Sequence, residues 1–161
     1  MKTEACKKIL IIRRKALGDS LLTISSITQL SEFFVGAEID IIIDHQFVDI
    51  IKSTINDVKI FSYPDQTSNW PKFIRSQNYD IVIDYLGSAR TSFWTLFSGA
   101  PIRIGYDFRI RKWAYNYRIN NNTLSDPSRN SASSTVALRN YHTGPLLSCP
   151  EYKNIYQTVN N

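Results

Sequence analysis

The sequence predicts an α/β protein, built as a Rossmann-like parallel sheet with helices on both faces. Short runs of β-branched and aliphatic residues alternate with longer stretches of helical periodicity along most of the chain. The apolar runs are continuous rather than alternating, which is typical of strands covered on both sides. Small or acidic residues follow several of these runs, where helices are expected to begin.

Length and composition fit one globular domain. The chain has 161 residues, of which 43% are apolar, and a formal net charge of +5, which favours anionic partners. No apolar run approaches the roughly 20 residues of a spanning helix, and the run after residues 1–8 is too short for a secretory signal, so a cytoplasmic protein is expected. The cysteines and histidines are far apart and predict no metal site: Cys6, Cys149, His45 and His142.

The first strand is predicted over residues 9–13, followed by a tight turn at Leu17 and Gly18 and a helix over residues 20–34. Gly18 would allow positive φ or a close backbone approach at the turn. Apolar residues at spacings of three and four predict the buried face of this helix: Leu21, Ile24, Ile27, Leu30 and Phe34.

The later elements repeat the strand–helix alternation. Strands are predicted over 38–43, 58–62, 80–84 and 102–106, and helices over 47–53, 70–77 and 89–97. After about residue 118 the composition changes. Residues 1–119 therefore form the predicted domain, residues 120–135 an Asn-, Ser- and Thr-rich loop, and residues 136–161 a tail of unassigned structure.

Three separated motifs carry a family resemblance. They read KILIIRRKALGDSLL at 8–22, YDIVIDYLGSARTSF at 79–93 and SGAPIRIGYDFRIRKWAYN at 98–116. In this order the motifs resemble the amino-terminal region of heptosyltransferases, or glycosyltransferase family 9, which are inverting enzymes of bacterial lipopolysaccharide assembly. The resemblance covers about residues 8–119 and implies the N-terminal, acceptor-side half of a two-domain GT-B fold.

The resemblance also implies the ligands. The family requires no metal or other cofactor; its co-substrate is a nucleotide-sugar, usually ADP-heptose, held mostly by a second domain that residues 120–161 do not resemble. The implied acceptor is the lipopolysaccharide core or another anionic glycolipid, which would bring the protein into peripheral contact with the inner face of the cytoplasmic membrane. A fragment, a split enzyme and a degenerate product all remain open.

Asp19 is the candidate catalytic residue. By the resemblance it would act as the general base that deprotonates the acceptor hydroxyl; from the residues alone it could equally be a helix N-cap. Acceptor-binding candidates at the same turn are Arg13, Lys15 and Gly18. Arg13 and Lys15, with Arg14 between them, could support an anionic ligand or simply be solvated charges.

A second cluster of acceptor-binding candidates follows the strand predicted over 80–84: Asp84, Gly87, Ser88 and Arg90. Carboxyl ends of parallel strands share one edge, so this cluster should lie beside the first. The alternatives are loop or helix capping for Asp84 and a backbone-geometry role for Gly87.

Residues 103–118 combine arginines and lysine with aromatic residues, and this composition leaves several interpretations open. It suits stacking on bases, sugar faces, anionic lipid headgroups at a membrane interface, or a partly buried aromatic helix with a solvated basic face.

Two classes of function remain for the chain as a whole. One is a heptosyltransferase-type enzyme; the other is a non-catalytic module that binds glycolipid or a protein partner. No base-reading element is visible, so no nucleic-acid partner is expected.

Overall fold

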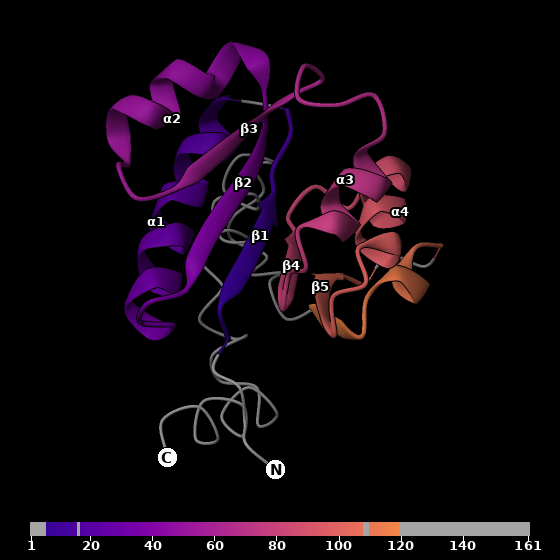
Figure 1. Cartoon of the computed structure of the whole chain (residues 1–161). Helices are drawn as coiled ribbons and strands as arrows, with labels where there is room; N and C mark the ends of the chain where they lie inside the picture. The colour runs from indigo at the N-terminus through magenta and orange to yellow at the C-terminus, as the bar shows by residue number, and fades with distance from the viewer. Residues whose placement is uncertain (1–5, 16, 108–109, 120–161) are drawn as a thin grey trace, which may run out of the picture.

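A computed structural model of the chain describes residues 6–15, 17–107 and 110–119. Within these residues six strands form one sheet in the order β3-β2-β1-β4-β5-β6 (Figure 1). The elements are β1 (Lys8–Ile12), α1 (Leu17–Phe33), β2 (Glu38–Asp44), the 3-10 helix η1 (His45–Phe47), α2 (Val48–Thr54), β3 (Lys59–Tyr63), α3 (Trp70–Ser76), β4 (Ile81–Asp84), α4 (Ala89–Phe97), β5 (Ile102–Tyr106), the 3-10 helix η2 (Lys112–Ala114) and β6 (Tyr117–Ile119). The loop and tail predicted over 120–161 lie outside the described residues.

The sheet is parallel throughout, with β1 between β2 and β4. Ile9 pairs with Ile39 on one side and with Ile81 on the other. The chain builds outward from β1 to β3, then returns to place β4 on the opposite side, so the strand order reverses between β1 and β4. In such sheets ligands bind beyond the carboxyl ends of the strands at this reversal. The predicted Rossmann-like α/β class is confirmed.

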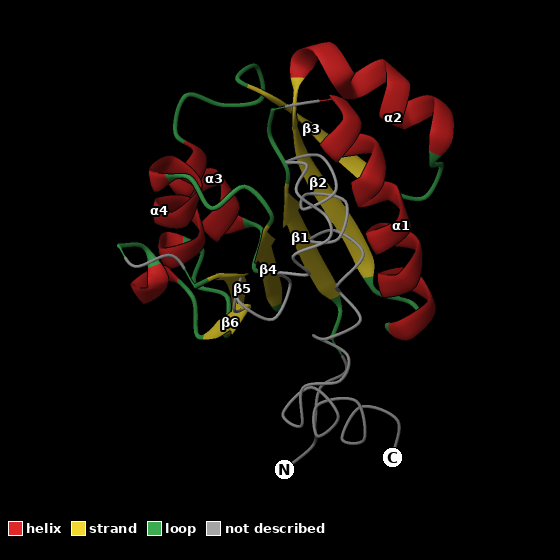
Figure 2. Ribbon diagram, turned by 180° about the vertical axis from the view of Figure 1, so that it is seen from behind, coloured by secondary structure: helices red, strands yellow, loops and turns green. Residues whose placement is uncertain are grey.

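Two apolar layers sandwich the central strands. Successive side chains of β1 point to opposite faces, so Ile9 and Ile11 join one layer and Leu10 and Ile12 the other. α1 closes the first layer with α2 beside it, as Figure 2 shows, and α3 and α4 close the second. Burial on both faces explains why these strands are continuous apolar runs in the sequence.

The start of α1 differs from the prediction. The helix begins at Leu17, so Gly18 lies inside its first turn without positive φ, and the turn after β1 is made instead by Lys15, whose φ is +67°. The predicted turn at Leu17 and Gly18 is therefore wrong. A pattern read from glycine alone misses a left-handed lysine, because that conformation is uncommon outside glycine, asparagine and aspartate.

The buried stripe of α1 also differs from the predicted one. Leu21 is 39% exposed and Ile24 is half-buried, whereas the fully buried residues include Ser20, Thr23 and Ser26 beside Ile27 and Leu30. The Thr23 hydroxyl donates to the Asp19 carbonyl oxygen at 2.9 Å within the same helix. Small polar side chains can thus be buried on this face of α1, and an apolar periodicity cannot detect them.

Residues 110–119 do not form the aromatic helix that was one interpretation of the sequence. They make η2 and then β6, which pairs with β5 through Ile104 and Tyr117. Tyr115 is buried, while Trp113 and Ile110 are exposed. None of the described helices combines the length and apolar character needed to cross a bilayer.

Candidate active site

Arg13 and Asp19 form an ion pair at the strand-order reversal. Arg13 directly follows β1 and is 5% exposed; its guanidinium pairs with the Asp19 carboxylate through one terminal nitrogen and donates to the Tyr85 carbonyl oxygen at 2.7 Å through the other. This cation thus ties the loop after β1 to the loop after β4. The side chain of Asp19 remains 23% exposed, so a buried arginine holds a carboxylate that solvent can reach.

Asp19 lies in the first turn of α1 rather than at its N-cap, because the helix begins two residues earlier. A carboxylate there is favoured by the positive end of the helix dipole. A Cβ atom built on Gly18 would meet no atom within 4 Å, so a side chain at this position would extend into open space beside Asp19. Glycine leaves that approach clear.

Arg14 and Lys15 turn toward β2 instead of toward Asp19. The Arg14 Nε atom donates to Asp44 at 2.9 Å, and the Lys15 backbone N–H donates to the second oxygen of the same carboxylate at 3.0 Å. Asp44 therefore fixes the backbone that carries the left-handed Lys15. The Lys15 side chain is exposed at the rim of the site.

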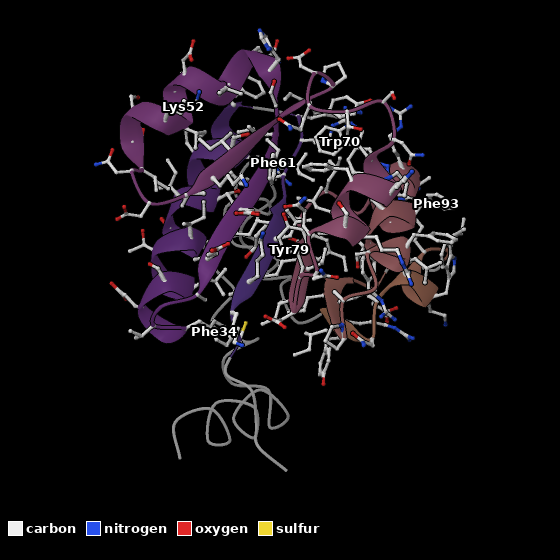
Figure 3. The ribbon with its side chains drawn as sticks, in the orientation of Figure 1. Phe34, Lys52, Phe61, Trp70, Tyr79 and Phe93 are labelled. Atoms are coloured by element: carbon white, nitrogen blue, oxygen red, sulfur yellow. The ribbon has the colours of Figure 1, made fainter. Side chains whose placement is uncertain are left out.

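Tyr63, at the end of β3, connects Arg14 with Arg90. The guanidinium carbon of Arg14 lies 3.4 Å from the centre of the Tyr63 ring, and Arg90 donates to the Tyr63 hydroxyl at 2.5 Å. Behind Tyr63, the rings of Trp70 and Trp94 stack with centroids 5.3 Å apart. Figure 3 labels Trp70, at the start of α3. Arg90 thus links α4 to the end of β3, where Tyr63 also contacts Arg14.

Asp84 is enclosed by hydrogen-bond donors. One carboxylate oxygen accepts the backbone N–H groups of Leu86 and Gly87 at 3.0 and 2.9 Å, and the other accepts the Tyr115 hydroxyl at 2.7 Å. The residue is 1% exposed, and burial raises the pKa of its carboxyl, although the bonds from Gly87 and Tyr115 oppose the shift. Asp84 therefore lies where it shapes the loop after β4. This position matches the loop-capping alternative to acceptor binding.

The loop after Asp84 is shaped in the same way. Gly87 takes a left-handed φ of +62°, and Ser88 caps α4 through a reciprocal pair of bonds with Thr91. Arg111 reaches back from the segment after β5 to donate to the Gly87 carbonyl oxygen at 2.6 Å. Gly87 and Ser88 therefore have backbone and capping positions, and Ser88 is half-buried.

Gly105 explains why the third sequence motif contains a glycine. A Cβ atom at Gly105 would lie 2.4 Å from the ring of Tyr115, closer than any real contact. The missing side chain lets this ring lie against β5, where its hydroxyl reaches both Asp84 and Ser92. The second and third motifs thus meet as one buried unit around the Asp84 carboxylate.

Of the predicted site residues, the structure brings Arg13, Gly18 and Asp19 together, with Lys15 at the rim. Sequence reasoning missed Asp44 and Tyr63 as site residues. Both end strands, so the rule that ligands collect at carboxyl ends of parallel strands would have pointed to them. Among the described residues no group of histidine, cysteine and acidic side chains could hold a metal ion.

The fold has close structural relatives. This chain is similar to Escherichia coli heptosyltransferase WaaC with ADP (TM-score 0.61, 17% identity, 83% of this chain and 45% of that chain). It is also similar to E. coli ADP-heptose LPS heptosyltransferase II (0.63, 22%, 85% and 41%) and to a family 9 glycosyl transferase from Veillonella parvula (0.62, 18%, 99% and 42%).

The chain shares a heptosyltransferase fold. It spans less than half the length of these structures, so the likeness concerns the fold of one part of them. The resemblance inferred from the three motifs is thereby confirmed at the level of the fold. Neither a protein-family model nor a curated protein matches the sequence.

Proposed function

We propose that this chain is the acceptor-side part of an inverting heptosyltransferase-like glycosyltransferase, in which Asp19 is the general base. The observation that carries the proposal is the Arg13–Asp19 pair: a partly exposed carboxylate is held at the strand-order reversal by an arginine fixed to the opposite loop. A general base needs this combination of fixed position and access to the substrate proton.

The proposed reaction is a single displacement at the anomeric carbon. Asp19 accepts the proton of an acceptor hydroxyl, whose oxygen attacks the anomeric carbon of the nucleotide-sugar while the bond to the diphosphate breaks, inverting the configuration. ADP appears with one neighbouring structure and ADP-2-deoxy-2-fluoro heptose with another, which supports an ADP-activated heptose as donor. The acceptor proposed is a lipopolysaccharide core sugar.

The test measures ADP release from ADP-heptose in the presence of a lipopolysaccharide core acceptor. The chain is assayed alone and mixed with a separately produced donor-binding half of a heptosyltransferase. Asp19→Asn should lower turnover by roughly 10²–10⁴-fold, the usual contribution of a positioned general base. The matched control is Asp49→Asn, which changes the first-turn aspartate of α2, an exposed residue. Equal turnover by Asp19→Asn and wild type would remove Asp19 from the chemistry.

The second candidate function is a module that binds glycolipid or a protein partner without turnover. It is favoured by the fact that Asp19 already satisfies a buried arginine, a role that needs no catalysis. Acceptor binding without ADP release in either assay format would support this candidate.

A further inference from the structure

A hollow lies at the carboxyl ends of β1, β2 and β3, and Arg14, which directly follows Arg13, forms part of its lining. It is an open depression of about 340 Å³ lined by Arg14, Asp44, His45, Gln46, Tyr63 and Pro64. This volume is near the lower end of ligand pockets, about 300–1,000 Å³, so it suits one small ring rather than a nucleotide.

The charges of the lining cancel each other. Arg14 and Asp44 are joined at 2.9 Å, and the Arg14 guanidinium also lies against the Tyr63 ring. Asp44 therefore compensates the charge of Arg14. The Arg14 side chain is only 11% exposed, so little of this charge faces the hollow. An anion would have to compete with Asp44 for this cation, so the hollow does not favour phosphate or carboxylate ligands.

The His45 ring is oriented by hydrogen bonds at its Nδ1 atom. Its Nδ1 atom bonds Asp65 at 2.6 Å and lies 3.3 Å from the Ser62 hydroxyl, which itself donates to Asp65 at 2.8 Å. The bond from Ser62 lowers the pKa of Asp65, and the bond with His45 adds to this shift. Serine and aspartate both meet the same ring nitrogen, so this is not the relay of a hydrolase, in which they meet opposite nitrogens.

The remaining lining groups match a sugar. Gln46 is exposed and offers an amide that can donate and accept, and Nε2 of His45 has no partner among the described residues. Pro64 is exposed and adds an apolar surface. A pyranose ring has the same mixture, since hydroxyl groups surround an apolar C–H face.

We infer that this hollow, defined by Arg14, Asp44, His45, Gln46, Tyr63 and Pro64, is a subsite for an uncharged pyranose of the acceptor glycan, next to the hydroxyl that Asp19 deprotonates. The inference rests on the proposed function and narrows its acceptor from an anionic core in general to one with a neutral sugar unit beside the reacting sugar. His45 and Gln46 are the specificity-determining residues.

The experiment is an NMR titration of the full ¹⁵N-labelled chain, without donor, using methyl α-mannopyranoside. Galacturonate and inorganic phosphate are titrated in parallel as anionic probes. Saturable shifts of the amides of residues 44–46 and Tyr63 are expected with the neutral sugar, at lower concentration than with either anion. Gln46→Ala and His45→Ala should each weaken binding about fivefold, the equivalent of one neutral hydrogen bond. The matched control is Gln66→Ala, which changes an exposed glutamine outside the hollow.

Absence of saturation, tighter binding of either anion, or unchanged affinity in both hollow variants would overturn the inference. All three variants change exposed side chains, and the same spectra report whether each is folded. The outcome separates from that of the proposed function, because Asp19→Asn should keep the sugar-dependent shifts. If Asp19→Asn keeps full turnover and the sugar still causes the amide shifts, only the proposed base is refuted. If transfer depends on Asp19 but the sugar causes no amide shifts, only the subsite is refuted.

Discussion

Asp19 and Asp84 have similar sequence surroundings and opposite environments. Each aspartate is near the end of a central strand, has a glycine within three residues and precedes or opens a helix. Asp19 keeps a 23% exposed side chain and pairs with the buried Arg13, whereas Asp84 is 1% exposed and enclosed by the N–H groups of Leu86 and Gly87 and the Tyr115 hydroxyl. Solvent access therefore distinguishes a carboxylate available for chemistry from one that shapes a loop.

The glycines differ in the same way. Gly18 faces open space, so its lack of a side chain clears an approach, while Gly105 faces the Tyr115 ring, so its lack of a side chain allows packing. Gly87 is needed for its left-handed backbone. One residue type thus serves access in the first turn of α1, packing in β5 and turn geometry in the loop after β4.

The largest effect is expected from removing the Asp84 carboxylate. Asp84→Ala leaves two backbone N–H groups and the Tyr115 hydroxyl without their acceptor in a buried place. Each such donor costs about 1–3 kcal/mol, so the three together should lower the free energy of unfolding by at least about 3 kcal/mol. Urea unfolding followed by circular dichroism measures it, with Asp19→Ala as the paired variant. A smaller loss for Asp84→Ala than for Asp19→Ala would reverse the comparison.

Gly105→Ala should come next, because its new methyl group would collide with the Tyr115 ring. Overpacking of this kind costs about 1–3 kcal/mol, measured by the same unfolding experiment. In a Tyr115→Leu background the ring is absent, so Gly105→Ala should cost much less unfolding free energy. A double-mutant cycle therefore tests whether the clash with the Tyr115 ring causes the loss. An unchanged penalty in that background would show that Tyr115 is not what excludes a side chain at position 105.

Much of this architecture could be predicted from the sequence. The bounds of α4 and β5 agree with prediction at both ends, and those of β1 to β4 differ by one residue at one or both ends. Continuous apolar runs and a capped helix start are local signals, so they need no knowledge of distant partners. β6 was missed because Tyr117 to Ile119 is short and is a strand only through its pairing with β5.

The site could be predicted less well, because its geometry depends on contacts across the chain. Arg13 and Asp19 were recognised as candidates, but not that Arg13 reaches the carbonyl of Tyr85. Nor could spacing show that Tyr115 would bury Asp84, since the two are 31 positions apart and meet only once β5 and β6 pair. Motif position alone therefore does not reveal that Asp84 is buried while Asp19 is partly exposed.

The acid dependence of stability should also distinguish the two carboxylates. Burial raises the folded-state pKa of Asp84 above its ordinary value of 3.8, so the folded chain binds this proton more readily than the unfolded chain. The stabilising contribution is fully present below the unfolded pKa and is lost as pH rises through the folded pKa. Relative to Asp84→Asn, the wild type should therefore gain stability between pH 7 and about pH 4. Urea midpoints of the two proteins at each pH measure this difference. A relative loss of wild-type stability on acidification would show that burial does not outweigh the hydrogen bonds to Asp84.

The smallest effect on stability is expected from Asp19→Asn, although this substitution has the largest proposed effect on activity. The amide oxygen can still accept from Arg13, and Arg13 keeps its bond to Tyr85, so the loss should be about 1 kcal/mol or less. Thermal unfolding of this variant beside Asp49→Asn measures the difference. A loss as large as that of Asp84→Ala would mean that Asp19 is mainly a structural anchor for Arg13. A nearly unchanged stability combined with lost turnover would distinguish the two aspartates by function as well as by environment. A carboxylate that contributes little to stability can take up a proton from substrate without destabilising the fold.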